Sequence, residues 1–207
     1  MSIIVYKYNQ TKTDKLKRKL LMLALFGILT NGFSQAIHED ERYVPETNPV
    51  ILEKLEQWKN LKFGLLMHWG AYSQWAIVES WSICPEEYGW CERKMGNNPD
   101  DYFAYVQEYE ALKTTFNPIK FNPEKWAEAA EYAGMKYMIF TTKHHDGFSM
   151  FDSKYTDYKI TGKGCPFSSN PKANVTKEIF EAFRAKGFWA GAYFSKPDWH
   201  HPNYWDP

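Results

Sequence analysis

The motif His144-His145-Asp146-Gly147 carries the residue types best suited to chemistry in this chain. It directly follows an apolar run, residues 137–143, which predicts a buried strand. Two imidazoles and a carboxylate are poor core residues, because each must be hydrogen-bonded or hydrated. Adjacent histidines on a strand point to opposite faces, so one could be a core residue and the other merely solvated. The alternative is a polar binding site at the end of the strand.

Two further strand-like runs end in the same kind of chemistry. The run 63–67 leads into His68-Trp69-Gly70, and the run 189–195 is followed by Asp198-Trp199-His200-His201. Because sites of parallel α/β folds form beyond the carboxyl ends of the strands, three such ends predict one shared rim.

Charge and aromatic content restrict the class of ligand. The chain balances 25 basic against 25 acidic residues, which removes the electrostatic case for a nucleic acid or an anionic membrane as partner. Aromatic residues make up 18% of the chain, and many lie beside His, Asp, Asn or Gly. Such rings can simply supply core area. Next to hydrogen-bonding groups, however, they also suit the faces and hydroxyls of a sugar.

Residues 1–36 resemble an export signal. A basic stretch, 15–19, precedes eleven uncharged residues, Leu20–Thr30, and Ser34-Gln35-Ala36 provides a small-residue cleavage site. Eleven residues are too few for a membrane-spanning helix, which takes roughly 20. The long stretch before Lys15 leaves an uncleaved anchor or a different start site open. The expected localisation is exported: periplasmic or extracellular, or lysosomal in a eukaryote.

The rest of the chain alternates predicted strands and helices. Residues 37–60 read as a polar connector and then a helix over about 49–60, which would cover the mouth or floor of the fold that follows. Strands are predicted at 63–68, 137–142 and 188–195, and helices at 100–112, 123–133 and 174–186.

The helix over 123–133 has the clearest local signals. Asn122 can cap it, Pro123 suits its first position, and Gly134 suits its stop. Its predicted apolar stripe consists of Trp126, Ala129, Ala130 and Ala133.

The series strand–helix–strand–helix–strand predicts an α/β fold with a parallel sheet. Such series close into barrels or open into doubly wound sheets, and no Gly-rich phosphate fingerprint follows any of the strands. We therefore expect a barrel. Because a complete one takes roughly 250 residues, the predicted fold of residues 61–207 is the N-terminal portion, about the first three βα units, of a (β/α)8 TIM-like barrel truncated at its C-terminal end.

The three cysteines fit an exported chain in part. Cys84 and Cys91 could close a small loop in an oxidising compartment, which would leave Cys165 unpaired. The odd thiol and the aromatic end of the chain, Tyr204–Pro207, suggest that a partner segment is missing.

Several segments resemble the secreted or lysosomal α-L-fucosidases of glycoside hydrolase family 29. The resemblance covers about Leu61 to the end of the chain. The matching segments are Lys62-Phe63-Gly64-Leu65-Leu66-Met67-His68-Trp69-Gly70-Ala71-Tyr72-Ser73, then 133–137 and 141–148, and finally Gly191-Ala192-Tyr193-Phe194-Ser195 with Asp198-Trp199.

The resemblance implies a (β/α)8-like barrel that hydrolyses terminal α-L-fucosyl bonds with retention of configuration. The substrate-binding roles that carry over fall on His68, Trp81, His144, His145 and Tyr193. Trp90 is an alternative to Trp81, because the family usually has Glu-Trp where this chain has Glu79-Ser80-Trp81.

No catalytic residue is assigned within the chain. In the family the nucleophile is an Asp at the end of the fourth barrel strand, and the acid/base lies further on, so both are expected beyond Pro207. Asp146 is expected to hold the histidine turn in place. A partial barrel would leave a sheet edge and apolar faces uncovered, so the chain is expected to fold poorly alone.

Three functions follow for comparison. The first is the N-terminal part of an exported fucosidase that acts on fucosylated oligosaccharides or glycoconjugates without a cofactor. The second is a carbohydrate-binding protein that kept the sugar site and lost the catalytic acids. The third is a metal-dependent hydrolase with His144, His145 and Asp146 as ligands. Consecutive histidines on one strand rarely present both nitrogens to one ion, so no metal is expected.

Overall fold

The computed structural model describes residues 44–85 and 92–204. Pro49–Pro207 form one compact unit, and the few described residues before Pro49 belong to another. The predicted export signal, residues 1–36, lies outside the described residues, as does Cys91. Within the described ranges, no helix combines the length and apolar character that a membrane span needs.

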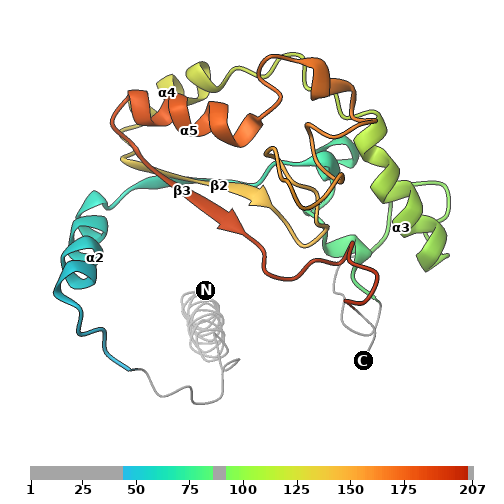
Figure 1. Cartoon of the computed structure of the whole chain (residues 1–207), viewed down its shortest axis with the longest axis horizontal. Helices are drawn as coiled ribbons and strands as arrows, with labels where there is room; N and C mark the ends of the chain where they lie inside the picture. Colours follow the sequence, from blue (N-terminus) through green and yellow to red (C-terminus); the bar gives the residue numbers. More distant parts are fainter. Residues whose placement is uncertain (1–43, 86–91, 205–207) are drawn as a thin grey trace, which may run out of the picture. The chain divides into compact units, whose positions relative to one another are not determined.

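Three parallel strands form one sheet in the order β1-β2-β3 (Figure 1). Their bounds are β1 (Gly64–Met67), β2 (Tyr137–Lys143) and β3 (Trp189–Phe194). All three predicted strands are confirmed, with ends that differ by one residue. Met67 pairs with Phe140 and Thr141 pairs with Tyr193. This register brings the carboxyl ends of the three strands to the same edge of the sheet.

Helices connect the strands in the predicted order. The α-helices among the described residues are α2 (Pro49–Leu61), α3 (Tyr102–Ala111), α4 (Pro123–Tyr132) and α5 (Val175–Ala185). Short 3₁₀ turns add η2 (Ala71–Trp75), η3 (Trp81–Ile83), η4 (Leu112–Thr114) and η5 (Pro166–Ser169). Helices α4 and α5 lie side by side over one face of the sheet (Figure 1). The fold is therefore of the α/β class, with a parallel sheet in one layer and its crossover helices in another.

Helix α4 shows which local signals the chain follows. The side chain of Asn122 accepts a hydrogen bond from the Lys125 amide at 2.9 Å, and Gly134 adopts φ +80°. The predicted apolar stripe is wrong in part, because Ala129 and Ala133 are exposed whereas Ala127 is buried with Ala130. Alanines occur all round this helix, so they could not indicate which side faces α5.

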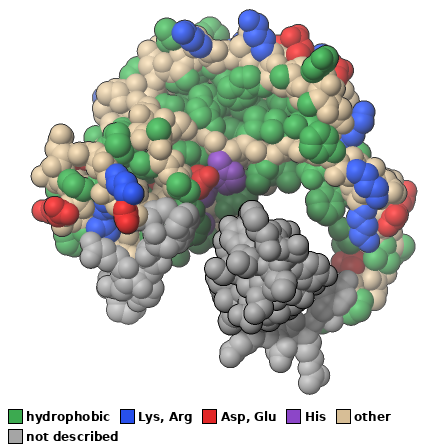
Figure 2. All heavy atoms as spheres, turned by 180° about the vertical axis from the view of Figure 1, so that it is seen from behind, with side chains coloured by type: hydrophobic (Ala, Val, Ile, Leu, Met, Phe, Trp, Pro, Cys, Tyr) green, Lys and Arg blue, Asp and Glu red, His purple; other side chains and the backbone are tan. Residues whose placement is uncertain are grey.

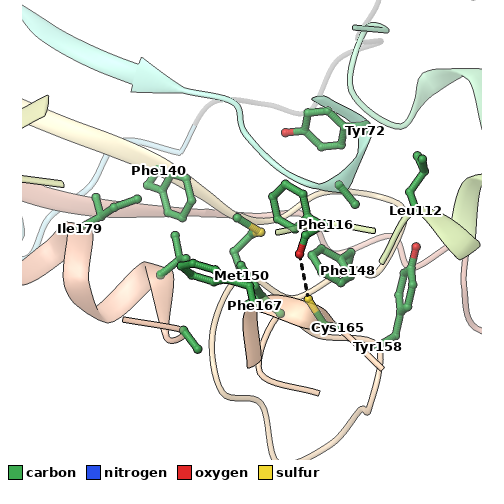
Figure 3. Packing of buried hydrophobic residues seen from close by; sticks show 14 of the residues in the cluster. Tyr72, Leu112, Phe116, Phe140, Phe148, Met150, Tyr158, Cys165, Phe167 and Ile179 are labelled. Atoms are coloured by element: carbon green, nitrogen blue, oxygen red, sulfur yellow. Dashed lines mark hydrogen bonds between the residues drawn. The ribbon is translucent and has the colours of Figure 1, made fainter. Parts of the chain in front are cut away.

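The core lies between the sheet and the helices α4 and α5. Met138 and Phe140 project from β2 toward Ile179 and Phe183 of α5, and none of these four side chains is exposed. Figure 3 shows how the core continues into the loop after β2, where the Cys165 thiol lies 3.4 Å from the Phe116 carbonyl oxygen. Both Cys84 and Cys165 are buried free thiols.

The opposite face of the sheet is covered only at one end by the described residues. Trp58 of α2 packs its edge against Tyr137, the first residue of β2, with ring centroids 6.1 Å apart. The predicted covering helix thus contacts the amino end of the sheet, away from the histidine motif. On the same face, Leu66 of β1 is 55% exposed, and Trp189 of β3, which is in register with Tyr137, is 43% exposed.

Candidate active site

The carboxyl ends of the three strands bring together the rings of three sequence-predicted residues. His68 follows β1, and its ring centroid lies 5.7 Å from that of His144 and 5.2 Å from that of Tyr193. His144 follows β2 and is stacked on Tyr193 of β3, with centroids 5.9 Å apart and ring planes at 11°. The three strand ends therefore lie close together, in agreement with the shared rim that the sequence predicts.

The other two predicted residues join the same group. Trp81 belongs to η3, in the long loop after β1, and its ring lies 5.0 Å from His145 and 6.1 Å from His144. We call His68, Trp81, His144, His145 and Tyr193 the histidine cluster. Trp90, the alternative to Trp81, lies outside the described residues.

The cluster is open to a ligand along its rim. His144 forms its base with only 3% of its surface exposed, and the other four rings are half-buried. Figure 2 shows histidine side chains reaching the surface beside acidic and apolar side chains. An arrangement of this kind presents ring faces and ring nitrogens together, which suits a small polar ligand with apolar patches.

A tight turn after β2 sets the direction of the two adjacent histidines. The amide of Gly147 donates to the His144 carbonyl oxygen at 3.2 Å, and Gly147 adopts φ +79°, where glycine is favoured. The turn bends the chain directly behind the imidazoles, so both of them face the rim instead of diverging to opposite sides of the sheet.

Asp146 holds this turn from inside the protein, as expected. Its carboxylate accepts a hydrogen bond from the Tyr109 hydroxyl at 2.8 Å and another from the Phe148 amide at 3.1 Å. Burial raises the pKa of Asp146 to about 6, although both hydrogen bonds act in the opposite direction. The carboxylate points away from the rim and has a structural role there.

Burial keeps both adjacent imidazoles neutral. It lowers the pKa of His144 to about 3, and neighbouring His145, His68 and Lys143 lower it further. Burial, and then the charge of Lys143, also lower the pKa of His145. A neutral imidazole has one nitrogen that donates and one that accepts, which is the pair of functions a hydroxyl group can match.

Lys143 fixes the loop that follows β3. Its side chain is 5% exposed, and its ammonium lies 3.0 Å from the Pro197 carbonyl oxygen and 3.6 Å from the Asp198 carboxylate. The backbone adds two bonds, from the Ser195 amide to the Lys143 carbonyl oxygen and from the Trp199 amide to that of His145. This loop is therefore attached to the histidine turn along its length.

Trp199 is a neighbour of the cluster that was not among the predicted site residues. Its ring lies 4.7 Å from His145 and 5.7 Å from Trp81. Tyr72 and Ser80 were missed as well: the Tyr72 ring lies 6.2 Å from His144, and the Ser80 hydroxyl 2.5 Å from its Nδ1 atom. Tyr72 and Trp199 had a signal in the sequence, since each closely follows a predicted strand within a segment of the family resemblance, whereas Ser80 had none.

The metal hypothesis finds no support in this geometry. Asp146 is directed to Tyr109 and not to the two histidines. Across residues 44–85 and 92–204, no group of three histidine, cysteine or acidic side chains has a geometry that could hold an ion.

The fold and the site define an α/β protein with a histidine- and aromatic-lined site at the carboxyl ends of its parallel strands. The sequence model of the family "Alpha-L-fucosidase" matches residues 31–207. The chain therefore belongs to the alpha-L-fucosidase family.

Individual relatives agree with this assignment. The chain is 39% identical to alpha-L-fucosidase isoenzyme 1 from Paenibacillus thiaminolyticus, with a TM-score of 0.57 over 73% of this chain and 31% of that structure. It is 27% identical to a Bacteroides thetaiotaomicron fucosidase, described as a trapped covalent intermediate in complex with 2-fluoro-fucosyl fluoride, with a TM-score of 0.53 over 81% of this chain and 34% of the other. Human plasma alpha-L-fucosidase is 28% identical over 80% of this chain and 34% of its own length. The chain thus spans about a third of the length of the curated relatives it matches.

Proposed function

We propose that this chain supplies the sugar-binding part of a retaining α-L-fucosidase, which releases terminal α-L-fucose from oligosaccharides or glycoconjugates. The observation that carries the proposal is the convergence of five rings from three strand ends and one loop into the histidine cluster. Family membership supplies the reaction class.

The chemistry of the cluster suits fucose in two ways. The neutral imidazoles of His144 and His145, and the ring nitrogens of His68, can form hydrogen bonds with ring hydroxyls. The faces of Trp81 and Tyr193 can pack against the C–H groups and the methyl group of a deoxy sugar. Because His144 and His145 carry no charge, they add no repulsion to the positive charge that develops on the sugar during glycoside cleavage.

No catalytic role is assigned to Asp146 or Asp198. A retaining mechanism needs two carboxyl groups about 5–5.5 Å apart, one as nucleophile and one as acid/base. Asp146 is fully buried against Tyr109, and Asp198 is paired with Lys143. The trapped covalent intermediate of the Bacteroides relative supports a covalent, and hence retaining, mechanism for this chain.

The same reasoning extends to the fold and the location. We propose that β1, β2 and β3 are the first three strands of a (β/α)8 barrel, supported by their consecutive order and by the position of the cluster at their carboxyl ends. Residues 1–36 are proposed to direct export, in agreement with a plasma fucosidase among the relatives.

A direct assay tests the proposal. The full-length gene product is expected to release 4-nitrophenol from 4-nitrophenyl α-L-fucopyranoside, and the His144→Ala variant should lose at least about a hundredfold in kcat/KM. The β-L-fucoside serves as control and should not react. A folded full-length protein that binds L-fucose without cleaving the α-fucoside would instead establish the non-catalytic carbohydrate-binding alternative. Absence of both binding and cleavage would refute the proposal.

A further inference from the structure

Ser80 makes the one hydrogen bond that the His144 side chain forms among the described residues. The Ser80 hydroxyl lies 2.5 Å from Nδ1 of His144, and Ser80 is completely buried. The two residues are 64 positions apart, in the loop after β1 and the turn after β2. This contact therefore joins two of the segments that build the histidine cluster.

The surroundings of Ser80 decide which atom donates. A buried hydroxyl proton without an acceptor is costly, whereas an unused lone pair on the same oxygen is tolerated. Within the described part of the chain, the Ser80 hydroxyl has no partner besides His144. If Nδ1–H donated to Ser80, the Ser80 proton would be left buried and unpaired. The arrangement that pairs both groups is the one in which the Ser80 hydroxyl donates to Nδ1.

We propose that Ser80 is a positioning residue that fixes the tautomer of His144 with its proton on Nε2, so that this imidazole donates a hydrogen bond to a hydroxyl oxygen of the bound sugar. The inference deepens the proposed function and rests on it for the identity of the ligand. The tautomer itself is independent of any activity.

Two features of the site agree with this assignment. The stacking of Tyr193 and the edge of His68 restrict rotation of the His144 ring, so Nδ1 stays on the Ser80 side. His144 is also neutral because it is buried, and only a neutral imidazole can accept a hydrogen bond from the Ser80 hydroxyl.

The tautomer can be measured directly. In the ¹⁵N-labelled full-length protein at neutral pH, long-range ¹H–¹⁵N spectra should show His144 protonated at Nε2 and unprotonated at Nδ1, with signals assigned by their loss in His144→Asn. Protonation at Nδ1 would overturn the inference. Because this measurement needs no substrate, it decides the tautomer even if the protein cleaves no fucoside.

Variants of Ser80 test the consequence for binding. Ser80→Ala should give a mixture of His144 tautomers and lower both kcat/KM and L-fucose affinity about tenfold, whereas Ser80→Thr, which keeps the hydroxyl, should restore the Nε2 tautomer. Ser82→Ala is the matched control: Ser82 is equally buried in the same loop, and its hydroxyl has no partner among the described residues. It should change neither tautomer nor affinity.

The outcomes separate positioning from mere stability. An unchanged tautomer and unchanged fucose affinity in a folded Ser80→Ala protein would contradict the proposal. A loss of activity of the same size in Ser82→Ala would also contradict it, because it would show that the loop responds to any lost hydroxyl. If Ser80→Ala does not fold, the wild-type tautomer and the Ser80→Thr variant still decide the question.

Discussion

Gly147 and Asp198 approach each other so closely that a Cβ atom on Gly147 would collide with the Asp198 carboxylate. The same Cβ would lie 2.9 Å from the Cβ of His200. The turn that aims His144 and His145 at the rim is thus packed directly against the loop that follows β3. Its shape depends on a residue without a side chain, because Gly147 also adopts φ +79°.

Substitution of Gly147 should therefore lower the unfolding free energy more than substitution of a glycine that has the same φ angle but free space around its Cβ position. Gly187 also adopts φ +79°, and nothing lies within 4 Å of its Cβ position. Gly187→Ala is expected to lose about 1–2 kcal/mol of unfolding free energy from backbone strain alone. Gly147→Ala should lose about 1–3 kcal/mol more, because of overpacking. Equal losses in urea denaturation would show that the approach to Asp198 has no energetic effect.

Two buried tyrosines provide a second matched pair. The Tyr109 hydroxyl donates to Asp146, whereas the Tyr158 hydroxyl is buried with no partner among the described residues. Tyr109→Phe should reduce the unfolding free energy by about 1–3 kcal/mol, since it leaves a buried carboxylate short of a donor. Tyr158→Phe should be neutral or stabilising. The prediction fails if denaturation curves of the two variants coincide.

The pKa of His144 makes the stability of the protein sensitive to acid. Its pKa is about 3 when folded and about 6.5 when unfolded, so below pH 6.5 the unfolded chain binds more protons. Stability from this group is complete above pH 6.5 and is lost as the pH falls toward 3, with a slope of up to about 1.4 kcal/mol per pH unit. Thermal denaturation of wild type and His144→Asn between pH 4 and 7 should show the two curves converging in acid. Parallel curves would contradict it.

Asp146 should have the opposite effect over nearly the same range. Its pKa is raised from 3.8 to about 6 in the folded protein, so the folded state binds more protons between these values. The contribution of Asp146 to the unfolding free energy therefore increases as the pH falls from 6 to 4. The Asp146→Asn variant removes that contribution, and its stability relative to wild type should decline on acidification. A rise instead would show that the carboxyl group is ionised throughout.

Local signals predicted most of the fold. Asn122, Pro123 and Gly134 act within a few residues of helix α4, and the strands are continuous apolar runs, so both could be predicted from neighbouring residues alone. The buried side of α4 could not be predicted in this way, because its alanines are identical side chains and differ only in what they pack against.

The residues of the site also fall into a group that local patterns predict and a group that they do not. The histidines and Tyr193 stand at predicted strand ends, and parallel pairing brings those ends together. The contacts of Ser80 with His144 and of Tyr109 with Asp146 join distant parts of the chain, in loops or helices whose paths no local pattern specifies. The sequence therefore predicted which side chains meet the rim but not which side chains orient them.

One measurement tests the central claim, that the strand ends form a site for fucose. The histidine ring C–H signals of the full-length protein can be followed by NMR while L-fucose is added. The signals of His68, His144 and His145 should shift together and saturate with a single Kd, whereas those of His200 and His201, which lie beyond the histidine cluster, should stay unchanged. Shifts confined to His200 and His201, or no shift at saturating fucose, would contradict the account.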